Sequence, residues 1–128
     1  MAGPNQIDRD RFIEMLADRF PVVLEEMDAS CEGLLHPEMS TLARAAQAAI
    51  SDEDVQSVRA HFSFIDEVFR QATPEVKNAI NVSFLECISF TGRHGKRINA
   101  RQLLSPILQQ ELIALEAYLA KIYGDSKQ

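Results

Sequence analysis

Apolar residues recur at alternating spacings of three and four in two long stretches of the chain. This spacing follows the 3.6-residue period of an α-helix and places each set on one helix face. Four prolines stand where segments of this kind begin, and there the missing proline N–H costs no hydrogen bond. The pattern therefore predicts an all-α fold. The apolar sets are Val55, Val58, Phe62, Ile65, Phe69 and Leu108, Leu112, Leu115, Leu119, Ile122, and the prolines are Pro21, Pro37, Pro74 and Pro106.

Capping residues set the expected helix boundaries. Asp8 or Asp10 is expected to cap the first helix, because a carboxylate accepts hydrogen bonds from the free N–H groups of the first turn. Ser51 followed by three acids predicts the start of a fourth helix, since the helix dipole favours negative charge there. Thr73 followed by Pro74 predicts a further start. The expected helices are 8–20, 21–33, 37–50, 52–72, 74–90 and 106–123, with a short helical turn at 100–104.

The segment 76–90 leaves two interpretations open. It is rich in residues that favour strands, such as Ile80, Val82 and Phe84. Its polar residues do not alternate with the apolar ones at a period of two, and its start carries a strong cap, so we favour a helix. A helix that is apolar on nearly all sides belongs at the centre of a core.

The expected helices are joined by short loops, which favour antiparallel neighbours. We therefore predict a single-domain bundle of five to six antiparallel helices over residues 1–128, with frayed ends at about 1–6 and 124–128. One form of this bundle is a stack of two helical hairpins. The segment 37–50 would then pair with 52–72, and 74–90 with 106–123.

Charge is distributed unevenly along a chain of otherwise ordinary composition. The 128 residues are 46% apolar, which suits one domain with one core. The net charge of -6 divides into -8 for residues 1–54, with 12 acids and 4 bases, and +2 for residues 55–128, with 7 acids and 9 bases. An acidic half repels nucleic acid and anionic membranes and favours a basic partner. The same acids also fit a plain solvated surface.

Sequence signatures of common sites are absent. The chain has no phosphate loop, nucleophile elbow or dinucleotide fingerprint. Cys31 and Cys87 lie far apart within helical patterns, and we expect buried thiols rather than a disulfide. The N-terminal residues do not resemble a signal peptide, and no apolar stretch is long enough to span a bilayer. We expect a cytoplasmic protein with no cofactor and no membrane contact.

One loop concentrates positive charge. Arg93, Lys96, Arg97 and Arg101 lie close together around two flexible glycines. This composition suits capture of a phosphate, a nucleic acid or an acidic surface. The loop also follows a helix C-terminus, where cations are favourable, and Arg97 or Arg101 is able to pair with acids of the N-terminal half. We favour the internal or solvated interpretation.

Residues able to bind a metal or to catalyse a reaction are present but poorly spaced. His36, Glu38, His61, Glu67 and His94 place no two ligands on one helical turn, so we predict no metal site. We expect His36 to bond a backbone group and His61 to pack in a partly buried position. An enzyme using His36, Glu38 or Glu86 ranks last, with a pocket that holds His36 and Glu86 together as its distinguishing sign. The helical serines Ser63, Ser83 and Ser89 have no paired base in the sequence, so we predict no catalytic residue.

Several blocks of the chain resemble a family of small bacterial all-helical proteins without assigned activity. The resemblance covers about residues 10–120 and implies a shared fold more firmly than a shared site. Members resemble single-domain proteins of toxin neighbourhoods, where small acidic helical proteins serve as immunity partners that mask a toxin. The blocks are Gly33-Leu34-Leu35-His36-Pro37-Glu38-Met39, Leu42-Ala43-Arg44 with Gln47, Val58 to Phe69, Pro74-Glu75-Val76-Lys77-Asn78-Ala79 and Val82-Ser83-Phe84-Leu85-Glu86.

The leading hypothesis is a non-catalytic protein-interaction domain whose acidic half docks on a basic partner. In its finer form, the protein is an immunity protein that binds and masks a basic toxin. Charge complementarity would speed the association. The alternative is a phosphate-binding or nucleic-acid-binding regulator that uses the basic loop 93–101. The expected docking residues are Glu25, Glu26, Asp28, Glu32, Asp52, Glu53 and Asp54.

Overall fold

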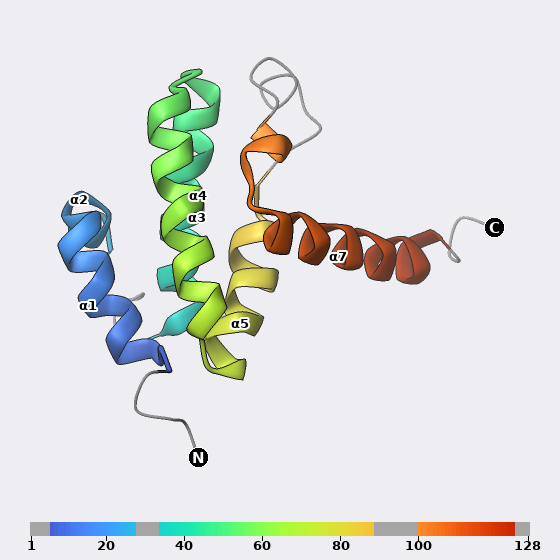
Figure 1. Ribbon diagram of the computed structural model, residues 1–128, viewed down its shortest axis with the longest axis horizontal. Helices are drawn as coiled ribbons and strands as arrows, with labels where there is room; N and C mark the ends of the chain where they lie inside the picture. Colours follow the sequence, from blue (N-terminus) through green and yellow to red (C-terminus); the bar gives the residue numbers. More distant parts are fainter. Residues whose placement is uncertain (1–5, 28–33, 89–99, 125–128) are drawn as a thin grey trace.

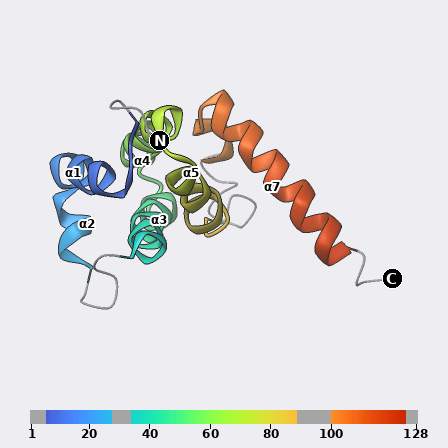
Figure 2. The same cartoon turned by 90° about the horizontal axis from the view of Figure 1, so that it is seen from below.

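A computed structural model describes residues 6–27, 34–88 and 100–124, and they form an all-α bundle, as predicted (Figure 1). Helices α3 and α4 form the centre of the bundle, with α1 and α2 on one side and α5 on the other (Figure 2). A parallel bridge between Ile7 and Ala72 ties the N-terminal segment to the α4–α5 link. The elements are α1 (Arg9–Arg19), α2 (Pro21–Glu25), α3 (Leu35–Ser51), α4 (Val55–Gln71), α5 (Pro74–Ile80), the π-helix η1 (Asn81–Leu85), the 3₁₀-helix η2 (Ala100–Leu103) and α7 (Pro106–Gly124).

The first helix begins as predicted, whereas the second is shorter than expected. The Asp8 carboxylate accepts a hydrogen bond from the Arg11 backbone N–H at 2.9 Å, so Asp8 is the N-cap of α1. Pro21 opens α2, but that helix ends at Glu25 instead of continuing to residue 33. The acidic run that follows Leu24 therefore begins at a helix end, and residues 28–33 lie outside the described part of the chain.

The turn between α3 and α4 corrects the prediction that Ser51 caps the fourth helix. Ser51 is the last residue of α3, and Asp54 caps α4 by accepting from the Ser57 N–H at 3.2 Å. The N–H groups of Glu53 and Asp54 bond back to the carbonyls of Ile50 and Ala49, which is a Schellman helix end. Ser51 and Asp54 are both suitable capping residues, but Ser51 is still part of α3, so the cap of α4 is Asp54.

Segment 76–90 is helical up to Leu85, which confirms the preferred interpretation, although the helix ends earlier than residue 90 and residues 86–88 form a turn. The Thr73 hydroxyl accepts from the Val76 N–H, and Pro74 occupies the first turn of α5. The chain then changes to π-helical hydrogen bonding over η1 without leaving the helical path. Local propensity for strand is overridden because this segment is packed on several sides.

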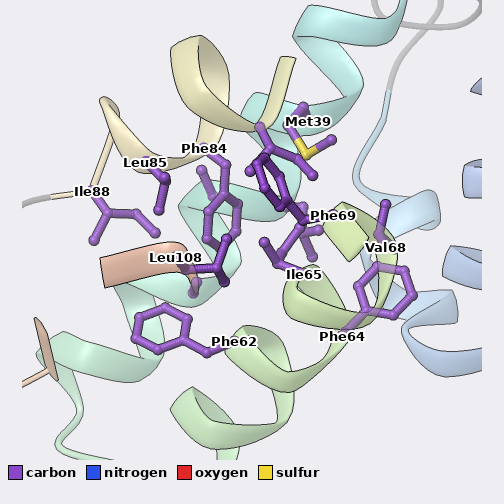
Figure 3. Close-up of a cluster of buried hydrophobic side chains, with 14 of the residues drawn as sticks. Met39, Phe62, Phe64, Ile65, Val68, Phe69, Phe84, Leu85, Ile88 and Leu108 are labelled. Carbon is purple, nitrogen blue, oxygen red and sulfur yellow. The ribbon is translucent and has the colours of Figure 1, made fainter. Parts of the chain in front are cut away.

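The core forms where α3, α4, η1 and the start of α7 meet (Figure 3). The Phe84 ring of η1 packs edge-on against Phe62 of α4, with ring centroids 6.3 Å apart, and both rings are buried. Leu108 of α7 points into the same cluster (Figure 3). Burial of these large side chains supplies the main stabilising free energy. The predicted central position of segment 76–90 is confirmed for Phe84 and Leu85.

The two-hairpin arrangement holds for its first half only. Helices α3 and α4 pack as an antiparallel hairpin, as predicted. Helix α7 does not lie along α5 but crosses η1 near its own start and then extends away from the bundle, as both views show (Figures 1 and 2). Its leucine stripe is buried only at Leu108 and Leu112 among the described side chains. The bundle therefore buries only the first part of this stripe.

Candidate interaction surface

The acidic residues predicted to dock a partner occupy two separate places on the fold. Glu25 and Glu26 stand at the C-terminal end of α2, and Asp52, Glu53 and Asp54 form the α3–α4 turn (Figure 1). All five side chains are exposed. The other two predicted residues, Asp28 and Glu32, lie outside the described residues.

The acids of the α3–α4 turn also serve the backbone. Asp54 is the N-cap of α4, so its carboxylate satisfies a free N–H of that helix. Glu53 has a φ of 59°, the left-handed region in which a residue with a side chain costs about 1–2 kcal/mol. Glycine is the favoured residue at this position of a Schellman end. A glutamate therefore projects from a position at which local stability favours glycine.

Ion pairs neutralise most of the described arginines. Arg11 pairs with Glu14, Arg19 with Glu67, and Arg70 with Asp66. Arg9 pairs with Glu38, and Arg101 pairs with Glu116. Glu25, Glu26 and Asp52 enter none of the ion pairs formed among the described residues, so no ion pair there offsets these three negative charges.

A partly buried ion pair joins α1 to α3. The Arg9 guanidinium donates from Nε to Glu38 Oε1 at 3.0 Å and from Nη2 to Glu38 Oε2, a bidentate arrangement. Glu38 is 1% exposed, and its carboxylate raises the pKa of Arg9 above the ordinary value, although partial burial opposes this. A cavity of about 310 Å³ is lined by Arg9 and Glu38 together with Ile13 of α1, Leu24 of α2 and Met27, which follows α2. Glu38 thus joins α3 to α1.

Of the four predicted anion-binding residues of the basic loop, the structure describes Arg101. Arg101 donates two hydrogen bonds to the Glu116 carboxylate, at 2.7 and 2.6 Å, and this holds the pKa of Glu116 below its ordinary value. The internal interpretation is therefore confirmed for Arg101, although its partner lies on α7 and not in the N-terminal half. The remaining predicted anion-binding residues, Arg93, Lys96 and Arg97, lie outside the described residues together with His94.

His36 and Ser83 come together across 47 residues of sequence. The Nδ1 atom of the exposed His36 ring lies 2.8 Å from the hydroxyl oxygen of the buried Ser83 in η1. This corrects two predictions, because His36 bonds a side chain instead of the backbone and Ser83 does have a base within reach. Neither residue lines the cavity at Arg9 or a second cavity of about 450 Å³ between α1 and α4. The pair links the start of α3 to η1.

His61 is a packing residue, as predicted. Its ring stacks on Phe20 with centroids 4.4 Å apart, and its Nδ1–H donates to the Ser57 carbonyl at 2.7 Å. A carbonyl oxygen only accepts, so the proton of the neutral ring is on Nδ1. Burial lowers the pKa of His61, and the hydrogen bond to Ser57 only partly opposes this.

The remaining candidate features concern metal binding, membrane spanning and two side chains near the end of η1. The described residues contain no cluster of three or more metal-binding side chains and no helix suited to cross a membrane. Cys87 is exposed, so the expectation of a buried thiol is wrong there, and Cys31 lies outside the described residues. Glu86, the residue after η1, is also exposed and is therefore not desolvated.

The fold and these contacts define an all-α bundle with an acidic surface and with most of its described arginines held in internal ion pairs. The chain belongs to the family described as Domain of unknown function (DUF7674), which matches residues 13–120. This agrees with the resemblance to a helical family without assigned activity. No curated protein and no solved structure matches the chain.

Proposed function

We propose that this protein is a non-catalytic interaction domain that binds a basic protein through the acids of α2 and of the α3–α4 turn. The observation that supports this most directly is the distribution of compensated and uncompensated charge. Arg9, Arg11, Arg19, Arg70 and Arg101 are each paired with a carboxylate, whereas Glu25, Glu26 and Asp52 are exposed and outside those pairs among the described residues.

Uncompensated surface charge acts mainly on the rate of association. A negative surface raises the local concentration of a positively charged partner and increases the association rate constant by about 10-fold or more at low salt. The effect weakens as salt shortens the screening length, which is about 10 Å at 0.1 M. The Glu53 conformation agrees with this function, since glutamate is kept where glycine would cost less.

The finer proposal is an immunity protein that masks a basic toxin. It rests on the resemblance to small acidic helical proteins of toxin neighbourhoods and on the negative surface. A toxin that acts on nucleic acid or nucleotides carries a basic surface, and a protein that covers this surface would block its substrate.

Co-expression of the protein with the product of the adjacent gene tests this proposal. We expect a stoichiometric complex whose association rate constant falls about 10-fold in the double variant Glu25→Lys/Glu26→Lys and loses much of its salt dependence. The double variant Glu75→Lys/Glu86→Lys is the control, because it changes the net charge equally at two exposed residues of α5 and the end of η1. Equal effects of both variants would reject this docking face, and recovery of the protein alone would count against the immunity proposal.

A further inference from the structure

The cavity at the Arg9–Glu38 ion pair lies where α1, α2 and α3 meet (Figure 2). Its volume of about 310 Å³ is at the small end of the range of about 300–1,000 Å³ that is usual for ligand pockets. Arg9 and the three apolar residues of its wall are each only half-buried, so the cavity opens to solvent. A space of this size suits one large side chain of another molecule better than a whole drug-sized ligand.

Three apolar side chains form most of the cavity wall. Ile13, Leu24 and Met27 pack against the hydrophobic core, and their remaining exposed surface lines the cavity. Such surface is stabilised when another apolar group removes it from water. Methionine also adapts its shape to an incoming group and makes favourable contacts with aromatic rings. The wall therefore favours an apolar occupant, and Met27 favours an aromatic one.

The polar part of the wall also suits an aromatic ring. The Arg9 guanidinium donates hydrogen bonds to Glu38 and Asp10. Hydrogen bonds of a guanidinium lie in its plane, whereas aromatic rings stack on its face. An aromatic side chain is therefore able to bind beside Arg9 without breaking the ion pair.

Negative charge predominates beside the cavity. Glu25 and Glu26 lie between Leu24 and Met27 in the chain, and consecutive Cα atoms are only about 3.8 Å apart. Both carboxylates are therefore within about 10 Å of the cavity wall, the distance over which charges act at 0.1 M salt. Neither acid enters an ion pair among the described residues, and Arg9 is itself paired with two carboxylates. These charges favour an occupant that is flanked by positive charge.

We propose that this cavity binds one aromatic side chain of the basic partner, with lysine or arginine residues beside that aromatic residue. The inference rests on the function proposed above and names what the surface at α2 recognises. The acids increase the association rate constant, whereas an anchor side chain buried in a pocket lowers the dissociation rate constant. Aromatic anchors of this kind are frequent energetic centres of protein interfaces.

Filling the cavity tests the inference in the complex with the co-expressed partner. Ile13→Trp places a large side chain in the cavity, and Leu24→Trp does so from α2. Met15→Trp is the control on the same helix as Ile13, because Met15 is also half-buried but lines the second cavity, between α1 and α4. Helical circular dichroism checks that each variant is folded.

We expect both cavity-filling variants to increase the dissociation rate constant by about 30-fold and to leave the salt dependence of association unchanged. Met15→Trp should change neither quantity. Equal dissociation rate constants for Ile13→Trp, Leu24→Trp and Met15→Trp would overturn the cavity site. The double variant Glu25→Lys/Glu26→Lys would still decide the acidic docking face separately.

Two synthetic peptides test the site without the natural partner. Both are rich in lysine, and they differ at one central residue, which is phenylalanine in one peptide and serine in the other. We expect the phenylalanine peptide to bind the full chain about 10-fold more tightly and to shift the NMR signal of the Met27 methyl group but not that of Met15. Ile13→Trp should weaken binding of this peptide alone, whereas Glu25→Lys/Glu26→Lys should weaken binding of both. Equal affinities of the two peptides without a shift at Met27 would overturn the cavity site, and if these affinities fall with added salt, the acidic face stands.

Discussion

Replacing Arg9 with methionine removes one partner of the ion pair between α1 and α3. Glu38 is 1% exposed, and it receives two hydrogen bonds from the Arg9 guanidinium. A buried charge that loses its ion-pair partner costs about 3–5 kcal/mol of stability. Because the Arg9 side chain is 31% exposed, part of its charge is screened by water, and we expect the lower figure, about 3 kcal/mol. Methionine keeps the apolar stem of the side chain, so the effect reports the lost charge.

Urea unfolding followed by helical circular dichroism measures this loss, with thermal unfolding as a second measure. A loss of about 3 kcal/mol corresponds to a fall in melting temperature of roughly 10 °C for a domain of this size. Arg11→Met is the matched control on the same helix, because Arg11 and Glu14 are 58% and 68% exposed and such pairs contribute at most about 0.5 kcal/mol.

The double variant Arg9→Met/Glu38→Leu separates the ion pair from simple packing. It removes both charges and leaves an apolar contact of similar size, so it should recover most of the stability lost in Arg9→Met. If Arg9→Met loses no more stability than Arg11→Met, the carboxylate of Glu38 does not depend on Arg9 and the reasoning is refuted.

Three further predictions concern His61, Glu53 and Phe84. Burial lowers the pKa of His61, so the imidazole of the unfolded chain binds a proton more readily than that of the folded chain. The free energy of unfolding should therefore fall as the pH drops below about 6.5. Urea unfolding measured above and below this pH should show that His61→Phe removes this part of the pH dependence. Glu53→Gly should stabilise the protein by about 1 kcal/mol, because glycine adopts a φ of 59° without steric cost. Asp52→Gly should destabilise the protein, because Asp52 has an ordinary φ of -81°. A lower melting temperature for Glu53→Gly than for Asp52→Gly would contradict this reasoning. Phe84→Ala should lower the free energy of unfolding in urea by about 3–5 kcal/mol, because it opens a cavity beside Phe62. Val82→Ala, at an exposed position nearby, should change it by less than about 0.5 kcal/mol. Equal effects of the two variants would refute the central position of Phe84.

Local signals in the sequence predicted the class of fold and most helix starts. Asp8 and Thr73 cap helices as expected, because a cap depends on a side chain and an N–H only two or three residues away. The choice between Ser51 and Asp54 was not local. Both residues are good caps, and the end of α3 beyond Ile50 decides which of them is used.

The contacts between residues far apart in the sequence were not predictable from sequence patterns. Arg9 with Glu38 and His36 with Ser83 are separated by 29 and 47 residues, and nothing in their spacing marks them as partners. Arg101 pairs within the protein, as the favoured interpretation predicts, but its partner Glu116 lies on α7 and not in the N-terminal half. The exposure of Glu25 and Glu26 was predictable, whereas their separation from the α3–α4 turn was not.

The sequence by itself determined that this chain forms amphipathic helices, where most of them begin, and that its surface is acidic. Periodicity and capping are properties of neighbouring residues, so they can be read without the fold. Only the tertiary structure decided which helix faces are covered. The stripe of α7 is continuous in sequence from Leu108 to Ile122, yet the bundle covers its first half only, because burial depends on which distant segments pack beside a helix and not on the helix itself.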